Sequence, residues 1–141
     1  MSVTRRWVPS VVWGTLILIA TSVPGAALPT VRVFPGFDKI VHASLYGVLG
    51  ALLVRALSSR EPHTREGRAL GARTAGARTA GARTVGLALG AIALMAAADE
   101  CHQLWIPGRS ADALDWVADV AGATIGVSLS YMALPRRERR T

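Results

Sequence analysis

Apolar runs alternate with charged segments along the chain, and this alternation limits what the chain can fold into. Four runs contain no Asp, Glu, Lys or Arg: Trp7–Val31, Ile40–Val54, Val85–Ala98 and Val120–Leu134. The net charge of +7 is concentrated in the segments between them, although 51% of the residues are hydrophobic. Glycine is frequent as well, and small residues let helices approach closely in lipid. This pattern is typical of an integral membrane protein rather than of a basic soluble domain.

The three later runs are short for membrane crossing. A helix of about fifteen residues reaches about 22 Å, whereas the hydrocarbon core of a bilayer is about 30 Å thick. Each run must therefore extend into its polar flanks. We expect spans at roughly residues 7–26, 38–57, 84–103 and 115–134. The predicted fold is an all-α, integral membrane four-helix bundle, with residues 1–141 forming one domain.

Two other interpretations of the runs stay open. Short apolar runs also form core helices of soluble proteins, although four of them in 141 residues disfavour this. The first run, preceded by Arg5 and Arg6, could be a cleaved secretory signal of the twin-arginine kind. We expect it to be retained as a helix. The single cysteine, Cys101, cannot form an internal disulfide, and adjacent His102 points to a different helix face, so no catalytic thiol is expected.

The basic residues are distributed asymmetrically, which predicts an orientation. Positive charge marks the cytoplasmic side of membrane proteins. Thirteen of the 16 basic residues lie at the N-terminus, within residues 55–83, or after Leu134. Six of the 9 acidic residues lie in the alternate segments. Only an even number of spans puts the three basic segments on one side. We therefore predict a multi-pass protein of the plasma membrane with both termini in the cytoplasm.

Residues 58–83 form a low-complexity, arginine-rich segment that contains three tandem Gly-Ala-Arg-Thr-Ala/Val repeats. Helical positions five apart differ by about 140°, so the arginines of a helical repeat would spiral around the axis. Binding to anionic lipid headgroups is one interpretation. We prefer a cytoplasmic loop that fixes the topology. No aromatic residues interleave with the arginines, so nucleic acid is not an expected partner.

Polar residues gather at the ends of the second, third and fourth spans that should lie outside. Helical spacing predicts one polar face on each span: Asp38, His42 and Tyr46; Asp99 and Gln103 with Glu100 beside them; Asp112, Asp115 and Asp119. Ionisable groups at a membrane boundary are costly and normally face the bundle interior in pairs. In a structural interpretation, Lys39 and Arg109 neutralise some of the acids and the cluster ties helix ends together. In a functional one, the cluster lines an outward-facing pocket.

Such a pocket could bind a cation, hold a substrate, or supply an acid and a base. The expected binding residues are Asp38, Lys39, His42, Tyr46, Glu100, Gln103, Arg109, Asp115 and Asp119. The candidates for acid–base chemistry are His42, Glu100 and Asp99. Because no metalloprotease, paired-cysteine, nucleophile-elbow or phosphate-loop motif is present, no metal or other cofactor is expected.

The polar residues also form an ordered pattern. It runs Asp38-Lys39-x-x-His42-x-x-x-Tyr46, Asp99-Glu100-x-x-Gln103, Pro107-Gly108-Arg109-Ser110, and then Asp115 followed by Gly122 and Gly126. This pattern resembles the VanZ-like family from about Phe37 to Gly126, apart from the arginine-rich segment. The resemblance implies a small multi-helix protein of the cell envelope, because the name-giving member confers low-level resistance to the glycopeptide teicoplanin. In one departure, Asp119 stands where the family usually has Asn, which adds a carboxylate to the fourth helix.

These observations lead to one preferred function and two alternatives. We expect a non-enzymatic envelope protein that alters glycopeptide susceptibility by binding a lipid-linked wall component, or the drug, at the outer face. The first alternative is an intramembrane enzyme acting on a lipid-linked envelope substrate, with Arg109 as a phosphate or carboxylate clamp. A small transporter is least favoured, because the first and third spans look apolar at mid-membrane.

Overall fold

Four α-helices and one short 3-10 helix make up the described part of the chain. A computed structural model describes residues 3–27, 34–58 and 73–134. The elements are α1 (Val3–Thr21), η1 (Gly25–Ala27), α2 (Phe37–Ser58), α3 (Arg73–Gln103) and α4 (Ala113–Ala133). No strand occurs within these ranges, so the prediction of an all-α, four-helix fold is confirmed. Arg32, residues 59–72 and the basic tail after Leu134 lie outside the described residues.

One boundary differs from the sequence prediction. Helix α3 begins at Arg73, well before the expected start near residue 84, so the last two repeats are helical rather than part of a loop. Alanine and arginine are among the strongest helix formers, and they outweigh the cost of a glycine in each repeat. The start of α4 follows a sequence rule: Asp112 is its N-cap, and its side chain accepts a hydrogen bond from the Leu114 amide at 2.8 Å.

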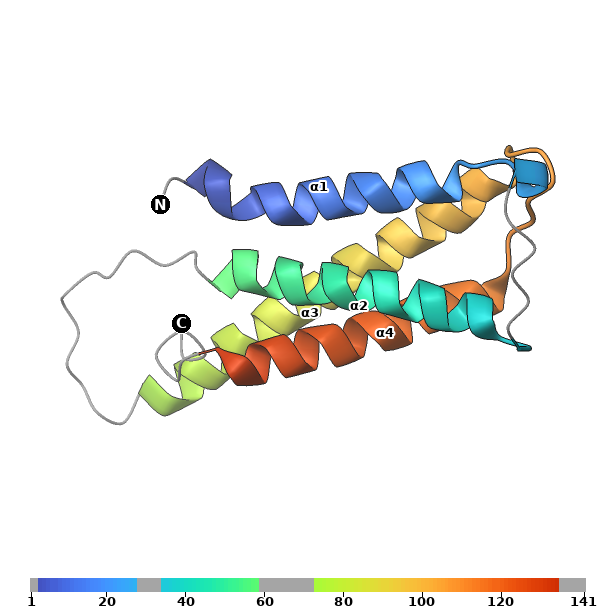
Figure 1. The fold of residues 1–141 in the computed structure, drawn as a ribbon. Helices are drawn as coiled ribbons and strands as arrows, with labels where there is room; N and C mark the ends of the chain where they lie inside the picture. The colour runs from blue at the N-terminus through green and yellow to red at the C-terminus, as the bar shows by residue number, and fades with distance from the viewer. Residues whose placement is uncertain (1–2, 28–33, 59–72, 135–141) are drawn as a thin grey trace.

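The helices run alternately up and down (Figure 1). The start of α1, the end of α2, the start of α3 and the end of α4 lie at one end of the bundle. Helices α2 and α4 make the most extensive contact, whereas α1 lies against α2 and touches α3 only slightly. Helix α3 crosses obliquely behind α2 (Figure 1). The opposite end, where α1 and α3 finish and α2 and α4 begin, is called the polar end below.

Glycines permit the close contact between α2 and α4. A Cβ atom added at Gly122 would overlap the backbone carbonyl of Ala43, and one added at Gly126 would overlap the carbonyl of Gly47. The two backbones therefore touch directly, as at small-residue interfaces of membrane helices. The Ser130 hydroxyl adds a hydrogen bond to the Ala51 carbonyl at 3.2 Å. This helix pair is the most extensively packed one in the bundle.

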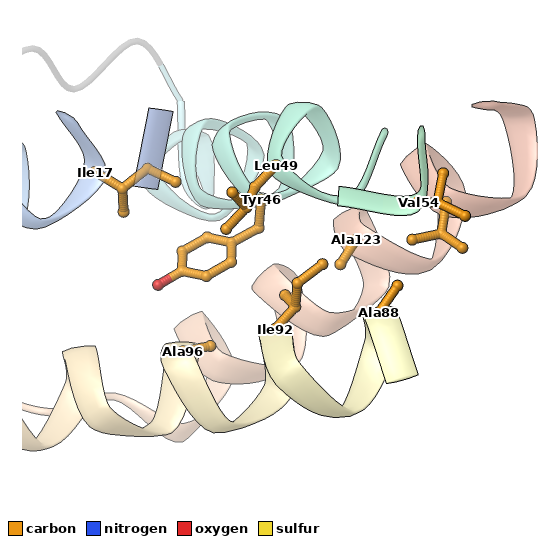
Figure 2. Packing of buried hydrophobic residues seen from close by; sticks show 9 residues of the cluster. Ile17, Tyr46, Leu49, Val54, Ala88, Ile92, Ala96 and Ala123 are labelled. Atoms are coloured by element: carbon orange, nitrogen blue, oxygen red, sulfur yellow. The ribbon is translucent and has the colours of Figure 1, made fainter. Parts of the chain in front are cut away.

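A small apolar core joins all four helices. Figure 2 shows its members, among them Ile17 of α1, Tyr46 of α2, Ile92 of α3 and Ala123 of α4, all at most 1% exposed. The Tyr46 ring extends from α2 into this core and carries its hydroxyl at the tip (Figure 2). Helix α1 is further attached to α2 by a hydrogen bond from the Trp13 indole to the Leu45 carbonyl at 2.9 Å.

Much of the outer surface is apolar. Large aliphatic side chains are exposed on every helix, including Ile19 (60%), Leu94 (74%) and Ile125 (61%). Two stretches, Phe37–Ser58 and Gly81–Gln103, are long and apolar enough to cross a membrane, and only 28% and 22% of their apolar windows are buried inside the protein. A core helix of a soluble protein is mostly buried instead. The predicted insertion of all four helices stays a prediction.

Candidate functional site

The polar end of the bundle contains most of the buried polar side chains among the described residues. Five of them are at most 7% exposed: Thr21, at the end of α1, and Asp99, Glu100, Gln103 and Asp119. The last four form the centre of this region. They come from the last turn of α3 and the second turn of α4, and the first turns of α2 face them. Three carboxyl groups therefore share one small buried region. Buried carboxylates are retained only where hydrogen bonds or cations compensate for their lost hydration.

Lys39 compensates the acids at the rim. Its ammonium group bonds to the carboxylates of Asp112 and Asp115, the latter at 2.7 Å, and lies 3.2 Å from Asp38. Its hydrogen bond, together with that of the Leu114 amide, holds the pKa of the Asp112 carboxyl below its ordinary value. We call these four residues the Lys39 cluster. It links the starts of α2 and α4, as the structural interpretation of the sequence expects.

Asp99 has donors of its own. The Thr21 hydroxyl donates to its Oδ1 at 2.6 Å, and the Tyr46 hydroxyl donates to its Oδ2 at 3.4 Å. All three side chains are at most 5% exposed, so the hydrogen bonds join α1, α2 and α3 in the interior. Both oxygens of Asp99 are thus satisfied within the protein.

His42, Glu100 and Asp119 form the third group, called the His42 cluster. The His42 Nδ1 lies 3.1 Å from Oδ1 of Asp119. Glu100 accepts a hydrogen bond from the Asp112 amide at 2.7 Å and a longer one from the Gln103 amide group at 3.5 Å. One nitrogen or oxygen atom from each cluster member lies within 4.8 Å of the others.

The structure thus brings most of the predicted binding residues to one place, but not all of them. Asp38 lies at the exposed edge of this region: 62% of its side chain is exposed, and it forms an ion pair with Lys39 at 3.2 Å. Arg109 lies apart from the carboxylates. Its guanidinium donates to the carbonyls of Val23 at 3.2 Å and Ala20 at 3.5 Å, and so caps the end of α1.

The loop that carries Arg109 is fixed against the end of α1 by its backbone. The Gly25 amide donates to the Pro107 carbonyl at 3.0 Å, and Gly108 adopts a φ of 75°, which favours glycine. The turn thereby holds Arg109, the residue that follows Gly108, beside the carbonyls at the end of α1. It leaves Lys39 as the cation that faces the acids at the polar end, among the described residues.

Two contributors were absent from the predicted set. Asp112 was recognised on the acidic face of α4, but not as the residue that both binds Lys39 and orients Glu100 through its amide. Thr21 belongs to no polar face with helical spacing, so the sequence did not indicate it. A hydroxyl near a helix end also usually bonds its own backbone. It does so here too, at 3.1 Å from the Ile17 carbonyl, while also reaching Asp99.

The arrangement has two chemical capacities. A partly buried histidine such as His42, held by a carboxylate, can accept or pass a proton, because the carboxylate fixes the ring and stabilises its charged form. An imidazole with two carboxylates can also ligate a divalent metal ion. An apolar groove on the outside of α2 and α4, lined by residues such as Ile40, Gly47, Ile125 and Leu129, is separate from these polar groups.

The comparisons with known proteins agree with the ordered residue pattern. The family model described as VanZ/LLP1 matches residues 3–134, nearly the whole chain. None of the curated proteins and none of the solved structures gives a match. The family is membrane-associated. The matched range contains all four helices and all the polar residues of the Lys39 cluster, the His42 cluster and the Asp99 contacts. The chain therefore belongs to the VanZ/LLP1 family.

Proposed function

We propose that all four helices cross the plasma membrane, with both termini on the cytoplasmic side. Exposed aliphatic side chains on every helix support insertion, because such a surface would be unfavourable in water. The polar clusters then lie at the outer boundary of the bilayer, where helix ends meet water. Thirteen of the 16 basic residues belong to the sequence segments that we predict to be cytoplasmic, which supports this orientation.

Cysteine labelling of the full chain tests the orientation. In a Cys101→Ser background, we expect Ser110→Cys to react with a membrane-impermeant maleimide in intact cells. Ser2→Cys and Thr141→Cys should react only after permeabilisation, because they belong to the basic side. Labelling of either terminal position in intact cells, with Ser110→Cys protected, would refute the orientation. Labelling after denaturation serves as the control for expression.

We propose further that the protein lowers susceptibility to glycopeptide antibiotics of the teicoplanin kind by binding a ligand at the polar end. Family membership supports the role, and the observation that carries the binding is the convergence of His42, Glu100 and Asp119 in one buried region. Six carboxyl groups of the described residues lie at this end, and the single positive charge of Lys39 is shared by three of them, those of Asp38, Asp112 and Asp115. The remaining negative charge favours a ligand with amino groups. Peptide parts of lipid-linked wall components, and glycopeptides themselves, can carry such groups.

Antibiotic susceptibility of cells that express the full chain tests this proposal. We expect the chain to raise the minimal inhibitory concentration of teicoplanin, and Glu100→Gln to abolish the increase, because it removes a central carboxylate while keeping the side-chain shape. Cys101→Ser is the matched control, since Cys101 is exposed on the same turn of α3. Equal protection by Glu100→Gln and the parent, at equal membrane levels, would disprove a role for the cluster.

The second candidate function is an intramembrane enzyme that acts on a lipid-linked envelope substrate. The 3.1 Å contact between His42 and Asp119 favours it, because a carboxylate that orients an imidazole is a recurring base arrangement. Mass spectrometry of envelope lipids in the same cells separates the two functions. A species that changes with the parent chain and not with His42→Gln supports catalysis. Unchanged lipids in cells that are protected support binding alone.

A further inference from the structure

We propose that His42, Glu100 and Asp119 form a binding site for one divalent transition-metal ion of the Zn²⁺ or Mn²⁺ class. This inference goes beyond the proposed function and does not depend on antibiotic susceptibility. One possible ligand atom from each of the three residues lies within 4.8 Å of the other two. Ligand atoms of a tetrahedral zinc ion are about 3.4 Å apart, given bond lengths of about 2.0–2.2 Å. Small side-chain rotations would bring the three into range.

An unsatisfied atom points to a ligand at this place. Asp119 is 0% exposed, and its Oδ2 has no hydrogen-bond partner in the part of the chain that the structure describes. A buried carboxylate oxygen without a partner is costly, and such atoms are rare in folded proteins. The other oxygen of Asp119 contacts His42, so the carboxylate is anchored while one lone-pair site stays open.

The charges in the region favour a cation with two positive charges. Asp99, Glu100 and Asp119 are buried together, and His42 is the basic side chain among them. Lys39 is already bonded to acids of the rim, with Asp115 at 2.7 Å. A metal ion would compensate Glu100 and Asp119 directly, whereas Asp99 has its own hydroxyl donors and needs none.

The chemistry of the three donors indicates the class of metal. Imidazole nitrogen suits Zn²⁺ and other transition metals, whereas sites for Mg²⁺ and Ca²⁺ are built from oxygen donors. The Asp112 amide holds Glu100 in place through its hydrogen bond at 2.7 Å, as supporting groups of metal ligands do. Three protein ligands leave a fourth position for water or for an oxygen of a bound molecule.

Metal binding to the purified full chain tests the proposal. The tag-free protein is extracted in detergent, stripped with EDTA, and titrated with ZnCl₂, MnCl₂, MgCl₂ or CaCl₂ while bound metal is measured by plasma mass spectrometry. We expect one Zn²⁺ or Mn²⁺ per chain, and much weaker binding of Mg²⁺ and Ca²⁺. His42→Ala and Glu100→Gln should each weaken Zn²⁺ binding about tenfold or more.

His102→Gln and Cys101→Ser are the matched controls, because they alter other possible metal ligands in the same turn of α3. Both variants should bind as the parent does. Failure of the parent chain to bind Zn²⁺ or Mn²⁺ would overturn the proposal without reference to any variant. So would loss of binding in the two control variants rather than in His42→Ala and Glu100→Gln. Because metal content is measured directly, a protein that binds metal without changing teicoplanin susceptibility separates this site from the proposed function.

Discussion

Gly122→Ala is expected to destabilise the protein by about 2 kcal/mol or more, although alanine is the better helix former. The new Cβ would meet the Ala43 carbonyl, which is backbone and cannot rotate away. Helices α2 and α4 must then move apart and lose contact along their length. Thermal denaturation in detergent, followed by size-exclusion chromatography, measures the effect as a lower midpoint.

Gly86→Ala and Gly90→Ala on α3 provide matched controls with the opposite sign. Nothing lies within 4 Å of a Cβ added at either position, so the clash is absent. Each should raise stability by up to about 1 kcal/mol, because alanine restricts the unfolded chain and favours the helix. If Gly122→Ala denatures at the same midpoint as these controls, the direct contact between the α2 and α4 backbones is wrong.

His42→Leu is expected to destabilise the metal-free protein by about 3 kcal/mol, because it leaves a buried charge without its partner. Asp119 is 0% exposed, and among the described residues its side chain bonds to His42, at 3.1 Å. The double variant His42→Leu/Asp119→Leu removes both members. Replacing a buried ion pair by apolar residues is often neutral, so the double variant should be more stable than His42→Leu alone.

Thermal denaturation in detergent with EDTA measures this pair of variants. The chelator keeps metal binding out of the comparison, so the result reports on the two side chains alone. His102→Leu is the control for replacing a histidine on the same end of the bundle, and it should change the midpoint little. A double variant that is less stable than His42→Leu would show that Asp119 stabilises the protein even without His42. That result would contradict the claim that Asp119 depends on His42.

Sequence reasoning predicted the helices well, because hydrophobic runs bounded by proline or charge define them. The second predicted span, residues 38–57, differs from α2 by one residue at each end. The third predicted span, residues 84–103, is close to the apolar stretch Gly81–Gln103, but helix α3 continues back to Arg73 into the expected loop, because alanine and arginine favour a helix. Insertion and orientation stay predictions, which rest on the placement of charge and on the exposed apolar surface.

The part of the candidate site that lies on helix faces was predictable from helical spacing. Positions four apart placed His42 and Tyr46 on one face of α2, and both side chains do point toward α3 and α4 partners. Spacing cannot say which helix a loop folds against, and so the contact of Arg109 with the α1 carbonyls was out of reach. Nor can it show that one residue, Asp112, serves Lys39 with its side chain and Glu100 with its amide.

The glycine contact between α2 and α4 divides the His42 cluster into a fixed part and an adjustable part. His42 and Asp119 lie on the two helices whose backbones touch, so their separation is set by the most extensive helix contact in the bundle. Glu100 sits on α3, which packs less extensively on that pair. A sliding motion of α3 would therefore change the reach of Glu100 while the other two groups kept their spacing. Movement of α3 alone would thus change the geometry of the cluster.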